Sequence, residues 1–122
     1  MNHRFLRGPW RVALLVATLV LGAMSTQGAE LPEIFRDADL ALGEKLIAEH
    51  RCSDCHARKV GGDGSSIYRP QGSIDTPGKL RGMVDMCNTE LNLGLFPEEV
   101  LSVAAVLQRD HYRFPARPAR RP

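Results

Sequence analysis

The sequence predicts an all-α domain of about three helices. Three stretches carry apolar residues at helical spacing, and each begins with a residue typical of a helix start. No segment shows the alternation of apolar and polar residues that is typical of strands. The chain has 122 residues, of which 43% are hydrophobic, and this is enough for one small domain.

Residues 1–29 have the three-part composition of a secretory signal. His3 and three arginines precede the apolar run Val12–Met24, and small or polar residues follow it. The run is shorter than the about 20 residues that cross a bilayer. We therefore expect cleavage between about residues 25 and 29 and export to the periplasm. A retained membrane anchor is the alternative.

The net charge of +2 combines an acidic central part of the chain with two basic ends. All 14 acidic residues, but only nine of the 16 lysines and arginines, lie between Glu30 and Tyr112. Nucleic-acid binding needs a basic face on the domain itself, so we expect no nucleic-acid partner. Residues 115–122 are rich in Pro and Arg, and we expect a disordered tail there. The folded domain is thus predicted over residues 30–114.

The first helix is predicted over residues 37–50. Leu40, Gly43 and Ile47 lie on one face, and either of two aspartates at the start can act as the N-cap. A glycine inside a helix costs about 1 kcal/mol relative to alanine. Gly43 is tolerable if another helix crosses closely at that point.

Two more helices are predicted in the second half of the domain. One begins at Pro77, capped by Thr76 or the aspartate before it, and ends before Gly94. The other spans residues 97–112, because a proline and two glutamates in its first turn suit a helix start. Residues 57–75, which are rich in Gly, Pro and Ser, are predicted as a loop.

The stretch "RCSDCHA" contains Cys52, Cys55 and His56 in the pattern C-x-x-C-H, which is a signature of c-type haem attachment. The three-residue offset brings two thiols to one edge of a porphyrin, where each forms a thioether bond with one vinyl group. The next residue then projects an imidazole towards the iron. A domain this short often needs a cross-link or bound group for stability, and a covalent haem would add such a group with apolar bulk. We expect one haem c, anchored by Cys52 and Cys55, with His56 as an axial ligand.

Three alternatives for this motif stay open. A thioredoxin-like redox pair requires a βαβ context, which this sequence does not predict. A zinc site formed with Cys87 has enough ligands, although Cys55 and His56 are adjacent and poorly placed to bind one tetrahedral ion together. A structural disulfide between two of the three cysteines is the third alternative.

Two stretches resemble class I c-type cytochromes. "GEKLIAEHRCSDCHA" resembles their N-terminal helix and haem motif, and "FPEEVLSVAAVLQRDHYRF" resembles their C-terminal helix. The resemblance covers roughly residues 40–58 and 96–114. It implies that the first and last helices cross at near right angles. Gly43 would then be at the close contact, with Leu107 or Tyr112 as its neighbour.

The function expected from these observations is single-electron transfer by a periplasmic monohaem cytochrome. No catalytic constellation such as a Ser/His/Asp set is present, so we expect no catalysis by the chain itself. We expect a monomer that meets redox partner proteins by weak, transient contact. The alternative is a haem-based protein that binds or senses NO, CO or O₂ at an open or weakly ligated iron position.

Several residues are candidates for the second axial ligand. Class I cytochromes usually place a methionine opposite the histidine, and here "RGMVDMCNTELNLG" offers Met86, Met83 and Cys87 as candidates. Met86 lies off the predicted apolar face, whereas Met83 and Cys87 lie on it and have burial in the core as their alternative role. Asn88, a distal Lys or His, or an open site are further alternatives.

Four further residues are not expected to bind the iron. His50 and His111 are expected at helix ends, where the helix dipole favours them. Tyr68 and Arg69 are expected in a solvated loop, and contact with the haem edge or a propionate is their alternative.

Overall fold

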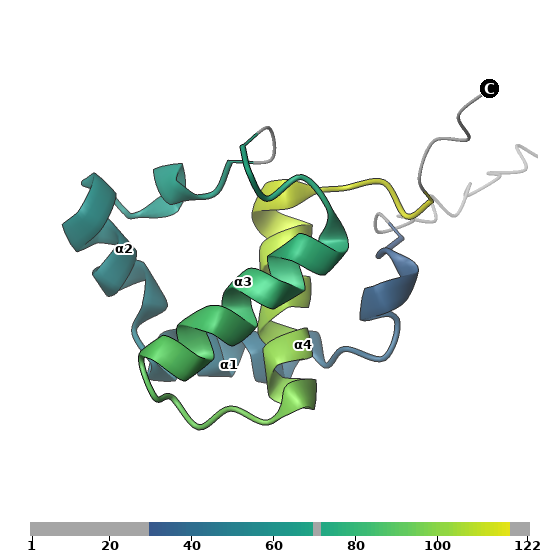
Figure 1. Cartoon of the computed structure of the whole chain (residues 1–122), viewed down its shortest axis with the longest axis horizontal. Helices are drawn as coiled ribbons and strands as arrows, with labels where there is room; N and C mark the ends of the chain where they lie inside the picture. The colour runs from purple at the N-terminus through teal and green to yellow at the C-terminus, as the bar shows by residue number, and fades with distance from the viewer. Residues whose placement is uncertain (1–29, 70–71, 118–122) are drawn as a thin grey trace, which may run out of the picture.

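The structure, a computed structural model, describes residues 30–69 and 72–117. The α-helices in these residues are α1 (Leu40–Glu49), α2 (Cys52–Val60), α3 (Pro77–Glu90) and α4 (Pro97–Leu107), and no strand occurs among them (Figure 1). The all-α prediction is therefore confirmed, with one helix more than expected. None of the described helices has the length and apolar character to span a membrane. The expected leader, and residues 118–122 of the expected tail, lie outside the described residues.

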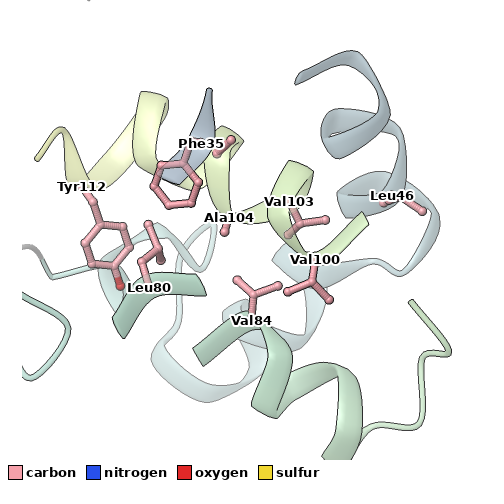
Figure 2. Packing of buried hydrophobic residues seen from close by; sticks show 9 residues of the cluster. Phe35, Leu46, Leu80, Val84, Val100, Val103, Ala104 and Tyr112 are labelled. Carbon is pink, nitrogen blue, oxygen red and sulfur yellow. The ribbon is translucent and has the colours of Figure 1, made fainter. Parts of the chain in front are cut away.

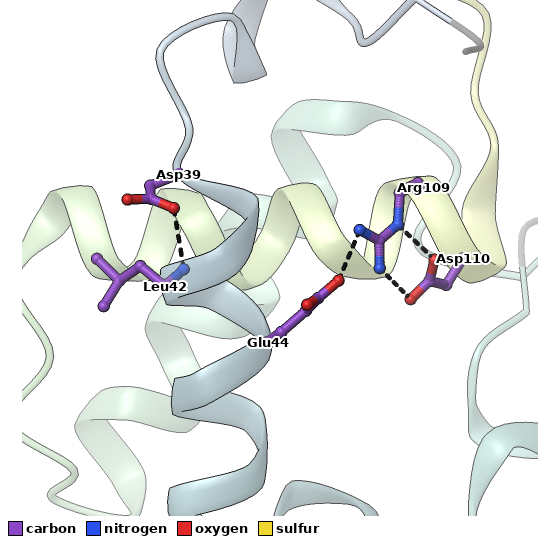
Figure 3. Close-up of polar contacts among 5 residues, drawn as sticks. All are labelled: Asp39, Leu42, Glu44, Arg109 and Asp110. Atoms are coloured by element: carbon purple, nitrogen blue, oxygen red, sulfur yellow. Dashed lines mark hydrogen bonds and ion pairs between the residues drawn. The ribbon is translucent and has the colours of Figure 1, made fainter. Parts of the chain in front are cut away.

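Side-chain caps mark the starts of two helices, as predicted. The Asp39 carboxylate accepts the backbone N–H of Leu42 at 2.9 Å, so α1 begins just after this residue (Figure 3). The Thr76 hydroxyl accepts the N–H of Lys79 at 3.2 Å at the start of α3. Both bonds satisfy N–H groups that have no partner within the helix.

The last helix ends in a wider turn. α4 begins at Pro97 as predicted and passes into a π-helical turn over Gln108–Tyr112. At the end of this turn the backbone N–H of Arg113 donates to the carbonyl of Gln108 at 2.8 Å. π-Helical turns contain one residue more per hydrogen-bonded ring than the α-helix and are frequent at functional sites.

The Cys-x-x-Cys-His motif lies in α2, so the loop prediction for residues 57–75 is wrong at its start. The helix extends to Val60, and a short 3₁₀ helix occupies Ser65–Ile67. Arg51, with φ at 51°, separates α1 from α2. No residue of α2 is buried. The helix is short and most of its residues are polar, so it lacks the long apolar stripe from which the other helices were predicted.

A close contact joins α1 to α4 at Gly43. The two helices cross rather than run side by side (Figures 1 and 3). A Cβ atom at Gly43 would lie 2.3 Å from the carbonyl oxygen of Ser102 and 2.8 Å from a methyl carbon of Val106. The predicted close contact is confirmed, but these two residues are its nearest neighbours, rather than Leu107 or Tyr112.

Polar contacts accompany the crossing of α1 and α4. The backbone N–H of Asp39 donates to the Ser102 hydroxyl at 3.1 Å, and this hydroxyl donates to a carbonyl one turn earlier in α4. Near the other end, Arg109 forms an ion pair with Glu44 of α1 at 2.8 Å and also bonds to Asp110 (Figure 3). The pair with Glu44 is exposed, and such pairs contribute at most about 1 kcal/mol. This ion pair is therefore a minor contribution to the crossing.

The hydrophobic core lies mainly between α3 and α4 (Figure 2). Its buried members are Phe35, Leu46, Leu80, Val84, Val100, Val103, Ala104, Ala105 and Tyr112. Helix α1 contributes one of these side chains and α2 contributes none. Ile47, Ile67 and Met83, which lie in the space between α1, α2 and α3, are only half-buried.

The two glycines at positions 43 and 82 offer a matched test of the helix crossing. We expect Gly43→Ala to lower the free energy of unfolding by about 3 kcal/mol, because the added methyl would overlap the α4 backbone. A Cβ at Gly82 of α3 would meet nothing within 4 Å. Gly82→Ala should therefore raise stability by up to about 1 kcal/mol through helix propensity. Urea unfolding of both variants measures the difference, and equal effects would contradict the close contact.

Candidate functional site

A cavity of about 460 Å³ lies between α1, α2, α3 and the end of α4. Cavities of about 300–1,000 Å³ are typical of cofactor and ligand sites. Much of its wall is apolar, including Leu46, Ile47, Leu80, Val84, Val103 and Leu107. The site residues predicted from the sequence, Cys52, Cys55, His56, Met83, Met86 and Cys87, all line this one cavity.

The cysteines enter the cavity from two helices. Cys52 and Cys55 are separated by about one turn of α2, so both lie on the same side of that helix. Cys87 approaches from α3, and all three are free, partly buried thiols. Burial raises the pKa of Cys52, and the nearby Cys87 and Cys55 raise it further. Burial also raises the pKa of Cys87, so both of these thiols are neutral near pH 7.

His56 meets Tyr68 at the edge of the cavity. Its Nδ1 atom lies 2.9 Å from the phenol oxygen of Tyr68, and the two rings meet edge-on at 78°. Burial, and then the nearby Lys59 cation, lower the pKa of His56. The imidazole is therefore neutral at physiological pH, which is the form that binds metal ions. With Nδ1 engaged by the phenol, Nε2 is the nitrogen left for a metal.

Tyr68 lines the cavity, so the expectation that it lies in a solvated loop is wrong. Burial, and then the nearby Cys52, raise the pKa of Tyr68 to about 12. The phenol therefore stays protonated. Arg69 is exposed, as expected, and its Nε donates to the carbonyl of Ser66 at 3.3 Å.

The glycine at position 64 explains how the loop returns to α2. Its φ of 83° lies in the left-handed region, which favours glycine. A Cβ atom there would lie 2.7 Å from the backbone nitrogen of Ala57 and 2.8 Å from the Cβ of His56. The close approach directs the 3₁₀ helix Ser65–Ile67 so that Tyr68, which follows it, meets His56.

The candidates for a second axial ligand differ in burial. Met83 and Cys87 lie one turn apart in α3 and are half-buried, whereas Met86 is 45% exposed. Asn88 has another role. Its side-chain amide donates to the carbonyl of Leu95 at 3.0 Å and accepts the N–H of Leu95 at 2.9 Å, which holds the connection between α3 and α4.

Both histidines assigned to helix ends have additional contacts. His50 is the C-cap of α1, as expected, but it also lines the cavity. His111 lies in the π-helical turn after α4 and stacks on Tyr68, with ring centroids 4.3 Å apart and planes at 26°. Sequence spacing alone gave no indication of either contact.

Among the described residues, no group of three or more His, Cys, Asp or Glu side chains is arranged to hold a metal ion. The zinc site considered from the sequence would therefore require these side chains to rearrange. No protein-family model, curated protein or solved structure matches this chain. The resemblance to class I cytochromes thus stays a prediction.

The raised pKa values of Cys52 and Cys87 predict how these thiols react in the full chain before any group is attached. An unfolded cysteine ionises near pH 9.0, and a folded one with a raised pKa needs a higher pH. Alkylation of both residues should therefore shift to higher pH in native buffer than in urea. Stability should fall as the pH rises above 9.0, because the unfolded state then releases more protons. Peptide mass mapping of alkylation against pH checks this, and identical profiles would contradict it.

Proposed function

We propose that this chain is a small exported monohaem c-type cytochrome that carries single electrons between redox partner proteins. The main support is the convergence of Cys52, Cys55 and His56 on one largely apolar cavity of about 460 Å³. Export is supported by the composition of residues 1–29. A haem attached here would supply a one-electron Fe(II)/Fe(III) couple.

The residues present fit a covalent haem in their chemistry. Cys52 and Cys55 are free thiols, and each S–H can add across a vinyl C=C bond without a leaving group. His56 is neutral, and Nε2 is the ring nitrogen that the phenol does not engage. The apolar walls would exclude water from the iron and bury the macrocycle. The same contacts would give α2 the apolar packing that its own side chains do not provide.

We also propose that Met83 would be the second side chain that binds the iron. It is half-buried and lines the cavity, whereas Met86 is 45% exposed and would have to leave solvent. Cys87 lies on the same face of α3, but burial raises its pKa, which disfavours the thiolate that binds metals. The thioether of Met83 needs no deprotonation. His/Met ligation raises the potential of a haem and suits electron transfer.

Partner contact is proposed at the rim of this cavity. Met86 and Leu91 both line it and are 45% and 57% exposed. Exposed apolar side chains around a cofactor suit the small, short-lived interfaces of redox encounters. No catalytic step is assigned to the chain, whose role would be to hold the haem and set its ligands.

Intact-mass analysis of the exported chain tests haem attachment. After expression with a haem-attachment machinery, the unmodified protein should gain the mass of one haem and keep it under acid–acetone extraction. The double variant Cys52→Ala/Cys55→Ala should have the mass of the bare polypeptide. Cys87→Ala is the matched control, because it removes a thiol from the same cavity but keeps the motif, and it should retain the haem. A bare polypeptide in the unmodified protein would overturn the proposal.

Optical spectra with and without CO test the second ligand. The unmodified protein should be six-coordinate and low-spin, and should bind CO slowly when reduced. Met83→Ala should open the iron, so that CO binds rapidly and the reduction potential falls. Met86→Ala should leave the spectrum unchanged. If Cys87→Ala opens the iron instead, the thiol is the ligand. Rapid CO binding by the unmodified protein would support the gas-binding alternative.

A further inference from the structure

The contact between Tyr68 and His56 goes beyond what haem attachment requires. Tyr68 is twelve residues from His56 in the chain and reaches it through a separate loop. We propose that Tyr68 is a positioning residue that fixes the orientation and tautomer of the His56 imidazole, and through it the potential of the iron. The inference rests on the proposed function, because it takes His56 as an axial ligand.

The hydrogen bond determines which nitrogen can bind metal. Nδ1 of His56 and the phenol oxygen of Tyr68 are 2.9 Å apart, and either group can be the donor. If the phenol donates, the proton of the neutral imidazole sits on Nε2, which then has no free lone pair. If Nδ1–H donates, Nε2 is free for iron. Ligation at Nε2 therefore requires Tyr68 to act as the acceptor.

Aromatic side chains of the turn that follows α4 hold Tyr68 in place. His111 stacks on its ring at 4.3 Å, and Tyr112 meets it edge-on at 6.1 Å between centroids. Both belong to the π-helical turn after α4. The buried amide of Gln108 fixes this turn, since it donates to the carbonyl of Phe114 at 2.8 Å and accepts its N–H at 3.3 Å. The Tyr68 ring thus contacts these two rings as well as that of His56.

The strength of the group that accepts the Nδ1–H of His56 affects the reduction potential of the iron. Partners that accept the second N–H of a ligating histidine raise its basicity and fix its ring orientation. A neutral phenol does this more weakly than a carboxylate, because it carries no charge. A more basic ligand favours Fe(III), so removal of the acceptor should raise the reduction potential.

Two tyrosine variants test the assignment. Tyr68→Phe removes the acceptor and keeps the ring that contacts His56 and His111. Tyr112→Phe removes a hydroxyl from the same aromatic group without touching His56. We expect a positive shift in reduction potential and a lower iron–histidine stretching frequency in the Raman spectrum for Tyr68→Phe only. The stretching frequency is measured on the reduced five-coordinate form made with Met83→Ala, or with Cys87→Ala if that variant opens the iron.

The outcomes separate this inference from the proposed function. If the haem is attached but the two variants shift equally, or neither shifts, Tyr68 has only a packing role and the inference is wrong. Equal thermal midpoints for the two variants would show that a unique shift in Tyr68→Phe does not come from lost stability. If the unmodified protein carries no haem, both the proposed function and the inference are overturned.

Discussion

The approach of α1 to α4 at Gly43 is the constraint on which the arrangement of this domain depends. Two backbones can come so close only where one side chain is missing, and a Cβ atom there would lie 2.3 Å from the Ser102 carbonyl oxygen. The crossing sets the position of α1 on α4, and with it the position of the last turn of α1. Arg51 then redirects the chain through a left-handed conformation, and α2 begins at the next residue. The position of the three motif residues is therefore set by a contact about one and a half helical turns before the end of α1.

The hydrophobic core covers only one side of the domain, and this explains why an apolar cavity lies next to α2. Buried apolar residues gather between α3 and α4, whereas α2 buries none of its side chains (Figures 1 and 2). A short helix gains most of its stability from packing an apolar face, and α2 has little to pack. Its place is defined by Arg51 at one end and by the loop at Gly64 on its flank. A large apolar cofactor bonded to Cys52 and Cys55 would complete the missing side of the core.

The elements that the sequence predicted well are those with a local signal. The cap at Thr76, the proline at the start of α4 and the glycine at the helix crossing are each recognisable from one or a few neighbouring residues. Helix α2 was missed because it is short and mostly polar, and it buries none of its residues. Met86 was predicted to lie off the apolar face of its helix, and in α3 it is 45% exposed.

The set of residues at the candidate site was only partly predictable for a related reason. The C-x-x-C-H motif is contiguous, and the candidates on α3 follow from helical spacing. Tyr68 reaches His56 only because Gly64 turns the loop back onto α2, a long-range effect without a periodic signature. Asn88 holds Leu95 through two hydrogen bonds that no local pattern indicates.

The wide turn at Gln108–Tyr112 has a consequence for how this domain could diverge. Each residue of an α-helix advances the chain by about 100° around its axis, so one residue more or less rotates everything that follows. Deleting a single residue from this turn would restore an ordinary helix and rotate the His111 and Tyr112 rings away from Tyr68. The α4 residues that pack on α1 would keep their register. Related chains that differ in length at this point should therefore share the helix crossing but differ in what supports the phenol.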